Sequence, residues 1–491
     1  MMSDISKSPL YQIARPESIA IFGASNNFSS MGTSVLNAIL TDGYEGRIFP
    51  VHPKEKRVLN IGAYSRAGDL PEVPDLAIIV LPTKIVAETL RACGEKGIRR
   101  AIIVTAGFSE VGGEGPARQE EIKAIARKYN IRFTGPNCIG VVNSQMKFNA
   151  TFLSSTCRPG FIGMASQSGS FITQMFDYLE ARFGQGFSTG FSLGNEADID
   201  MADCIRYLGA CPDTRAIALY IESIRRGREF IEAAREVSLT KPIVAFYVGG
   251  SETGKRACLS HTGALAGPDR LYDGVFKQSG IIRARSVEEM FDFCYALGSC
   301  PLPKGKRALI QTHSGGPGAA ADACGRSGIE LPALSSATLE KLRAYVPHTA
   351  SVKNPVDLTF TKNPLDYFKA IPEILLEDEG ADSLLVYFLA TEAMVNRALE
   401  SLGVPEAEID AQVKTIIEDQ CTSVAALMAS HGKPMLGFSF LNRQNPFIAG
   451  LQDNGVPVLA SPERAARALG ALVECSRLRE KLARSKRPAS V

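Results

Sequence analysis

The stretch "SIAIFGASNNFSSMG", residues 18–32, sets the pattern for the whole fold. A short apolar run ends at Gly23, small polar residues follow, and a helical pattern begins after them. This order predicts a buried strand, a tight turn and a helix, the repeating unit of a doubly wound α/β domain. Small residues in such a turn let backbone N–H groups approach a phosphate, and a helix N-terminus favours negative charge there.

Similar apolar runs, separated by helical stretches such as residues 84–97, complete a first block that closes near Asn143. They read "RIFPVHP" (47–53), "DLAIIVLP" (75–82), "RRAIIVTAG" (99–107) and "IRFTGPN" (131–137). Short runs rich in Ile and Val between helices predict a parallel sheet that is covered on both faces. The first block is therefore expected to be a nucleotide-binding type of domain.

The same pattern recurs in two further blocks. The strand-like runs of the second block are "GFIGMASQSGS" (160–170), "FSTGFSLGNEAD" (187–198), "AIALYIES" (216–223) and "KPIVAFYVGG" (241–250). The segment "PLPKGK" (301–306) reads as a linker because of its Pro, Gly and Lys content. The third block opens with "RALIQTHSGGPG" (307–318), which repeats the strand, small polar turn and helix. Two related doubly wound domains are predicted after the first.

The composition limits the classes of function. The chain has 491 residues, enough for about three domains, and a net charge of +2 that gives no electrostatic argument for nucleic acid. No apolar run is long enough to span a membrane, and the N-terminus lacks the basic and apolar regions of a secretory signal. The eleven cysteines include no C-x-x-C pair, which indicates reduced thiols in the cytoplasm.

The first turn does not match the dinucleotide fingerprint G-x-G-x-x-G. The second strand ends in "VHPK" (51–54), which offers no acidic residue for a ribose hydroxyl, so NAD is disfavoured. Lys54 suits a phosphorylated ligand instead. The alternative is a tight turn that binds nothing.

Two further turns have both a structural and a functional interpretation. In "GPNCIGVVN" (135–143), Asn137 and Asn143 flank an apolar stretch, which is consistent with a strand bounded by turn residues. In "SQSGS" (166–170), the serines precede a helix and are either a plain N-cap or a cradle for an oxyanion or phosphate.

Glu222 and His261 are the candidates for chemistry. Glu222 ends the strand in "YIESIRRG" (220–227), where open α/β sheets bind ligands, although a surface glutamate is the alternative. His261 lies among small residues in "SHTGALAG" (260–267). No spacing for further metal ligands and no G-x-S-x-G nucleophile turn accompanies it, and a structural histidine is the alternative. A carboxylate such as Glu222 on one ring nitrogen would leave the other nitrogen free to accept a phosphoryl group.

The motifs together resemble a known family. "GASNNFSSMG", "GPNCIGVVN", "SQSGS", "SLGNEADID", "YIES", "SHTGALAG" and "NPVDLT" occur in the order found in nucleoside-diphosphate-forming acyl-CoA synthetases, the relatives of succinyl-CoA synthetase. The resemblance covers roughly residues 10–470 and is greatest to α subunits of the ADP-forming members. It implies a Rossmann-like CoA-binding domain over 1–143, flavodoxin-like domains over 144–302 and 303–470, and a helix end with a tail over 471–491.

The resemblance also implies a reaction and its residues. A carboxylic acid, CoA and ATP are interconverted with acyl-CoA, ADP and phosphate through an acyl phosphate and a phosphohistidine. The family pattern assigns catalysis to His261 and Glu222, and phosphate binding to Ser168, Gly169, Ser170 and Gly263. It assigns CoA binding to Gly23, Ala24, Ser25, Ser29, Lys54 and Asn137, and it implies no metal ligand in this chain.

The resemblance further implies a partner. No ATP-grasp-like nucleotide domain follows residue 470, and no G-x-x-x-x-G-K-[ST] motif occurs. A separate β subunit is therefore expected to bind ADP or ATP with magnesium. Two other functions stay open from the residues: a CoA or acyl-CoA sensor without ligase activity, and a CoA transferase or thioesterase that uses Glu222 as its nucleophile.

Overall fold

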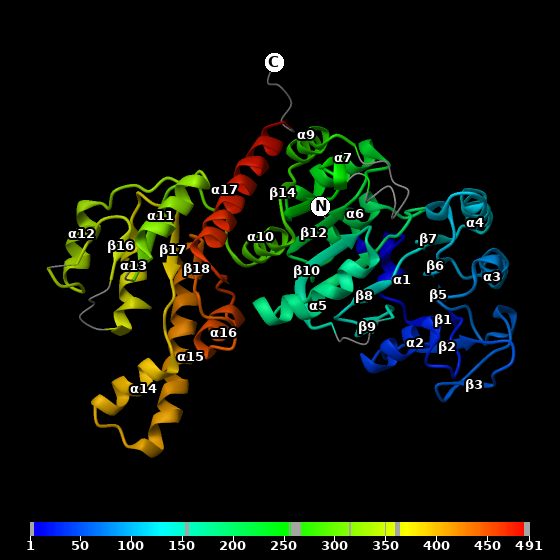
Figure 1. Cartoon of the computed structure of the whole chain (residues 1–491), viewed down its shortest axis with the longest axis horizontal. Helices are drawn as coiled ribbons and strands as arrows, with labels where there is room; N and C mark the ends of the chain where they lie inside the picture. The colour runs from blue at the N-terminus through cyan, green and yellow to red at the C-terminus, as the bar shows by residue number, and fades with distance from the viewer. Residues whose placement is uncertain are drawn as a thin grey trace. The chain divides into compact units, whose positions relative to one another are not determined.

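The structure is a computed structural model, and it describes residues 4–152, 157–254, 256, 267–313, 316–348, 350–358 and 364–485. The chain divides into two compact units near residue 285 (Figure 1). The first unit contains two large sheets, and the second contains a third sheet. The predicted α/β class, a Rossmann-like sheet followed by two flavodoxin-like sheets, is confirmed.

The first sheet is parallel and has the order β2-β1-β5-β6-β7. Its strands are β1 (Ser18–Phe22), β2 (Arg47–Val51), β5 (Leu76–Ile79), β6 (Arg100–Ile103) and β7 (Arg132–Thr134). The accompanying helices are α1 (Tyr11–Ala14), α2 (Met31–Thr41), α3 (Thr83–Lys96) and α4 (Gly115–Tyr129), with 3-10 turns η1 (Ile5–Lys7), η2 (Ala67–Asp69) and η3 (Ser109–Val111). A small hairpin, β3 (Arg57–Val58) and β4 (Ile61–Gly62), follows β2. Every residue of β1 is buried, as expected for a strand covered on both faces.

The second sheet has the order β14-β13-β12-β10-β11-β8-β9. Its strands are β8 (Val141–Asn143), β9 (Phe148–Asn149), β10 (Pro159–Ser166), β11 (Phe187–Ser192), β12 (Ala216–Ile221), β13 (Ile243–Tyr247) and β14 (Ile282–Ala284). The accompanying helices are α5 (Gly169–Phe183), α6 (Met201–Ala210), α7 (Gly227–Ser238) and α9 (Asp269–Ser279). Strands β10 to β14 are parallel, and β8 and β9 form an antiparallel hairpin on the edge. The boundary expected at residue 143 falls inside this hairpin.

The register of the second sheet brings three strand ends to one level. Ser166 at the end of β10 pairs with Ser192 at the end of β11 and with Tyr220 near the end of β12. The chain leaves β10 for β11 on one side and reaches β12 on the other, so the strand order reverses between β10 and β12. In open α/β sheets, such a reversal at the carboxyl ends is the usual location of a ligand site.

The third sheet, β16-β15-β17-β18-β19, repeats this topology in the second unit. Its strands are β15 (Ala308–Thr312), β16 (Val356–Asp357), β17 (Ser383–Tyr387), β18 (Met435–Phe438) and β19 (Val458–Leu459). The unit's helices are α10 (Val287–Ser299), α11 (Pro317–Arg326), α12 (Ser336–Arg343), η4 (Pro364–Tyr367), α13 (Ala370–Glu377), α14 (Glu392–Ser401), α15 (Glu406–His431), α16 (Pro446–Asp453) and α17 (Pro462–Ser485). Arg464 of α17 donates to both carboxylate oxygens of Asp292 on α10, at 2.7 Å each.

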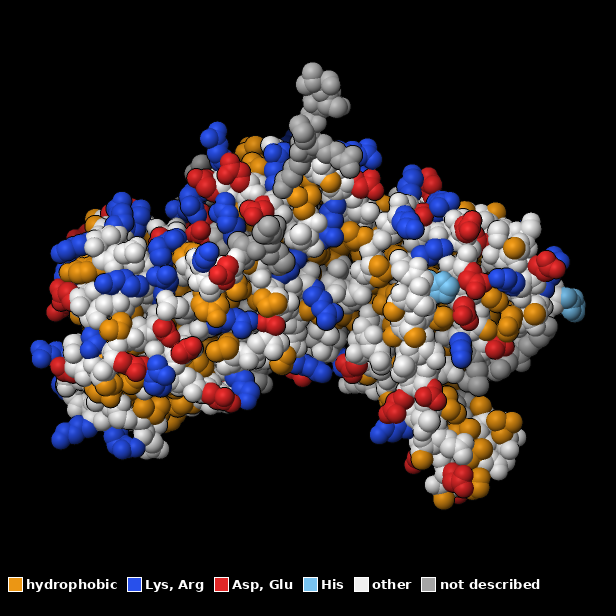
Figure 2. Space-filling model, turned by 180° about the vertical axis from the view of Figure 1, so that it is seen from behind, with side chains coloured by type: hydrophobic (Ala, Val, Ile, Leu, Met, Phe, Trp, Pro, Cys, Tyr) orange, Lys and Arg blue, Asp and Glu red, His pale blue; other side chains and the backbone are white. Residues whose placement is uncertain are grey.

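The surface carries both signs of charge. Basic and acidic side chains are interspersed on the face shown in Figure 2. Among the described helices, none is both long and apolar enough to cross a membrane. Every cysteine in the described ranges is a free thiol, and all of these except Cys300 are buried.

Candidate functional site

The turn after β1 is built by close backbone approach. Gly23 has φ +102°, and a Cβ atom there would lie 1.9 Å from the carbonyl oxygen of Val80. Only glycine fits such a position. Ala24 is buried behind the turn, and Ser25 N–H donates to Thr33 Oγ1 at 3.0 Å. The turn is therefore fixed before any ligand arrives, with α2 beginning immediately after it.

The turn's polar groups face outward. Ser29 is exposed, and its N–H donates to Asn27 Oδ1 at 2.9 Å. Lys54 is also exposed and follows β2, the strand next to β1. Its backbone N–H donates to His52 Nδ1 at 3.2 Å. Gly23, Ala24, Ser25, Ser29 and Lys54 thus belong to neighbouring strand ends of the first sheet, an arrangement suited to an extended phosphorylated ligand.

Asn137 lies apart from that group, because β5 and β6 separate β7 from β1. It follows β7 with φ +59°, a left-handed conformation that asparagine tolerates. Its Nδ2 donates to Asn195 Oδ1 at 3.3 Å, and Asn195 N–H donates to the carbonyl of Pro136 at 2.9 Å. A Cβ at Gly194 would lie 2.3 Å from the carbonyl oxygens of Pro136 and Asn137. Asn137 therefore joins the first sheet to the loop after β11.

Ser168, Gly169 and Ser170 form the start of α5, directly after β10. Ser166 Oγ accepts from the N–H of Ser168 at 3.1 Å and donates to the carbonyl of Ser168 at 2.6 Å, which makes the turn tight. Ser168 is half-buried and Ser170 is exposed. The first N–H groups of a helix have no intrahelical acceptor, so this turn presents donors to an anion.

Gln167 connects this turn to Glu222. Its Oε1 accepts from the backbone N–H of Glu222 at 2.6 Å and of Ser223 at 3.0 Å. Its Nε2 donates to Glu196 Oε2 and to the carbonyl of Ser223, both at 2.8 Å. One glutamine side chain therefore ties together the loops that follow β10, β11 and β12.

These loops line one pocket of about 230 Å³, counting the space open to solvent at its mouth. The lining residues are Gln167, Gly194, Asn195, Glu196, Glu222, Ser223 and Arg225. The side chains of Glu196 and Glu222 are both buried. Burial raises the pKa of Glu196 to about 8, against the opposing hydrogen bond from Gln167. The pocket thus contains two carboxyl groups beside an anion-binding helix start.

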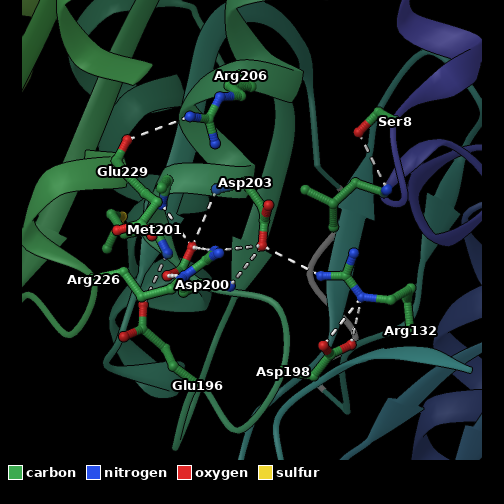
Figure 3. A network of polar contacts seen from close by, with 12 residues as sticks. Ser8, Arg132, Glu196, Asp198, Asp200, Met201, Asp203, Arg206, Arg226 and Glu229 are labelled. Atoms are coloured by element: carbon green, nitrogen blue, oxygen red, sulfur yellow. Dashed lines mark hydrogen bonds and ion pairs between the residues drawn. The ribbon is translucent and has the colours of Figure 1, made fainter. Parts of the chain in front are cut away.

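A network of ion pairs holds the two carboxyl-bearing loops (Figure 3). Arg226 donates to both oxygens of Asp200, at 2.5 and 2.7 Å, and to Asp203 at 3.1 Å. Arg132 on β7 pairs with Asp198 at 2.9 Å and with Asp203 at 3.5 Å. Asp200 also caps α6, accepting from Ala202 and Asp203 N–H. The loops after β11 and β12 are thereby braced against each other and against the first sheet.

His261 and Gly263 lie outside the described residues, so the predicted His261–Glu222 contact is not among the described contacts. Within the described ranges, no cluster of His, Cys, Asp and Glu side chains is arranged to hold a metal ion. Sequence reasoning missed Gln167, Glu196 and Arg225. Glu196 had the same signal that singled out Glu222, an acidic residue shortly after a buried strand.

Comparisons with known proteins agree with this geometry. Residues 17–144 match the CoA binding domain family, and residues 159–297 match the succinyl-CoA ligase like flavodoxin domain. The chain is 38% identical over 470 residues to the α subunit of acetate–CoA ligase [ADP-forming] II from Pyrococcus furiosus, covering 94% of this chain and 96% of that one. It is 37% identical to acetate–CoA ligase [ADP-forming] I from Archaeoglobus fulgidus, covering 77% of this chain and 55% of that longer protein.

A solved structure matches nearly the whole chain. It is the acetyl-coenzyme A synthetase 1 of Ca. Korarchaeum cryptofilum, described as dinucleotide forming and in complex with phosphate and ADP. The TM-score is 0.85 at 30% identity, covering 98% of this chain and 99% of that one. The sheets and their carboxyl-edge sites define a CoA-binding protein of the succinyl-CoA ligase type. The chain belongs to the nucleoside-diphosphate-forming acyl-CoA synthetases, among their ADP-forming members.

Proposed function

We propose that this chain is the α subunit of an ADP-forming acyl-CoA synthetase that works through a phosphohistidine at His261. The observation that carries the proposal is the joined set of strand ends in the second sheet. There, Gln167 connects the Ser168 turn to buried Glu222 by direct hydrogen bonds. An anion cradle beside a buried carboxylate suits a histidine that receives and releases a phosphoryl group.

In the reaction we propose, phosphate binds at Ser168, Gly169, Ser170 and Gly263, and CoA binds at Gly23, Ala24, Ser25, Ser29, Lys54 and Asn137. A phosphate oxygen attacks the carbonyl carbon of the acyl-CoA, the C–S bond breaks, and the departing thiolate takes the phosphate's proton. An acyl phosphate and free CoA result.

In the second step, an imidazole nitrogen of His261 attacks the phosphorus of the acyl phosphate. The P–O bond to the acyl group breaks, and the carboxylate leaves with the electron pair. Glu222 accepts a hydrogen bond from the other ring nitrogen, which keeps the attacking nitrogen unprotonated. ADP then takes the phosphoryl group from His261, giving ATP and free histidine.

The last step needs a nucleotide site, which we propose lies on a separate β subunit with an ATP-grasp fold and bound magnesium. The α-subunit name of a relative that matches this chain almost end to end supports this division. The acid is a small carboxylic acid, acetate in the printed names of these relatives. We further propose a cytoplasmic location and functional domains over residues 1–143, 144–302 and 303–470, followed by the helix end and tail, 471–491.

The test uses the full chain with radiolabelled phosphate and a panel of acyl-CoA thioesters, without a nucleotide. Acid-labile, base-stable label is expected on the wild-type chain with at least one thioester. The label should pass to ADP when a β subunit is added. CoA binding without label, with or without the β subunit, would identify a sensor instead. A trapped acyl ester on Glu222 would identify a CoA transferase or thioesterase.

A further inference from the structure

Glu196 has no part in the reaction described so far, yet it lies inside the same pocket as Glu222. Its side chain is only 2% exposed. Its backbone has φ +49°, a conformation that costs a non-glycine residue free energy. A buried acid at a strained position is unusual as a packing residue, because hydrophobic side chains fill cores without a desolvation penalty.

The hydrogen bonds around Glu196 define which of its atoms face which partner. Backbone N–H groups can only donate, so the two that reach Gln167 Oε1 fix the orientation of that amide. Gln167 Nε2 must then donate to Glu196 Oε2. The other oxygen, Oε1, accepts from the N–H of Met201 at 3.1 Å. Neither partner accepts a proton, so a hydroxyl on Glu196 would have to donate to another group in the pocket.

The charges near Glu196 favour its neutral form. Asp200, the N-cap of α6, repels a negative charge on Glu196, whereas Arg225 Nε lies 4.0 Å from Glu196 Oε2 and attracts one. Glu222 lines the same pocket, and Cys204 of α6 is a buried neutral thiol whose pKa is raised well above its ordinary value by burial. Burial outweighs the attraction of Arg225 and raises the pKa of Glu196 to about 8.

We propose that Glu196 binds the phosphoryl group as a neutral acid, donating its carboxyl proton as a hydrogen bond to a non-bridging phosphoryl oxygen. This inference rests on the proposed function, since it deepens the phosphate site of the same reaction. Two ionised carboxylates beside a phosphate dianion would repel it, whereas one carboxylate and one carboxylic acid supply an acceptor for the histidine and a donor for the phosphate. The proton stays on Glu196 throughout, so the balance of the reaction is unchanged.

The distinguishing variant is Glu196→Gln, because an amide keeps a donor at this position and cannot ionise. Glu196→Ala removes the donor. Exposed Glu236→Gln on α7 is the matched control. The dissociation constant of radiolabelled inorganic phosphate is measured on the full chain between pH 6.5 and 9.5, and thermal unfolding confirms that each variant is folded. Dividing wild-type by Glu196→Gln values cancels the ionisation of phosphate itself.

At pH 7, Glu196→Gln is expected to bind phosphate within about threefold of wild type, and Glu196→Ala about tenfold or more weakly, as expected for loss of one hydrogen bond to a charged group. Above pH 8, wild type should weaken relative to Glu196→Gln, because ionisation removes the donor and adds a like charge. Glu196→Gln as weak as Glu196→Ala in a folded protein, or a ratio that does not change with pH, would overturn the inference.

The same samples separate this inference from the proposed function. Label on His261 with acyl-CoA tests the relay, and phosphate affinity tests Glu196. If phosphate binds with the expected pattern but no acyl-CoA yields label, with or without a β subunit, the relay is wrong and the role of Glu196 stands. If wild type fails to bind millimolar phosphate at any pH, both are wrong.

Discussion

The carboxyl edges of the first two sheets solve different binding problems with the same topology. At the first edge, Ser29 and Lys54 are exposed and the backbone of the Gly23 turn supplies the shape. At the second edge, Glu196 and Glu222 are buried and are held by side-chain hydrogen bonds and ion pairs. The first edge is suited to holding a large ligand from outside, and the second is suited to controlling charge at a small one.

This difference teaches where substitutions should act. Exposed charges are screened by water and salt, so each contributes little on its own. Buried, oriented groups act in a weakly polarisable setting, where one lost hydrogen bond changes a rate by a large factor. Changes at the second edge should therefore reduce chemistry, and changes at the first should reduce CoA affinity.

The largest effect is expected for His261→Ala. Without the imidazole nitrogen there is no phosphoryl acceptor, so phosphate label on the chain should fall below detection with every acyl-CoA. CoA binding, measured by calorimetry, should stay within about twofold of wild type because the first edge is unchanged. Label that persists in this variant would place the phosphoryl acceptor elsewhere.

Glu222→Gln is expected to slow labelling about 10²-fold, because the amide no longer holds the histidine proton as a carboxylate does. The rate is measured by rapid quench with saturating acyl-CoA. The matched control is Glu232→Gln, an exposed residue on α7 that should label at the wild-type rate. Equal rates for both variants would remove Glu222 from the chemistry and leave it a structural role.

Gly23→Ala tests the backbone of the first edge. The added methyl would meet the carbonyl of Val80 at a positive φ, so we expect a loss of about 2–4 kcal/mol in the free energy of unfolding and a weaker CoA site. Chemical denaturation measures the first effect and calorimetry the second. Gly62→Ala is the control, since nothing lies within 4 Å of its Cβ position. An unchanged midpoint in Gly23→Ala would show that the turn relaxes.

Lys54→Ala should have the smallest effect. Loss of one exposed cation is worth about 1 kcal/mol, so CoA should bind about fivefold more weakly, and the difference should shrink at high salt. Labelling at saturating acyl-CoA should match wild type. Lys56→Ala, an exposed neighbour, is the control. A large loss of labelling rate in Lys54→Ala would mean that the two edges are not separate in function.

Much of this architecture could be predicted from particular residues. Apolar runs such as 18–22 and 216–221 are buried strands because their side chains cannot remain in water, and the small residues after them could only be turns. The hairpin of β8 and β9 could not be assigned to a sheet in this way. An edge strand is defined by its partner, and Val141–Asn143 pairs with β11, some 45 residues further along the chain.

The sequence by itself determined the class of fold, the family and the candidates Glu222, Ser168 and Lys54, because local apolar patterns and turn residues act over a few positions. Only the tertiary structure decided that Gln167 joins three loops, that Asn137 pairs with Asn195 instead of the Gly23 turn, and that Glu196 is buried with a raised pKa. The physical reason is that desolvation and hydrogen-bond partners depend on which strand ends become neighbours, and sheet register alone sets that.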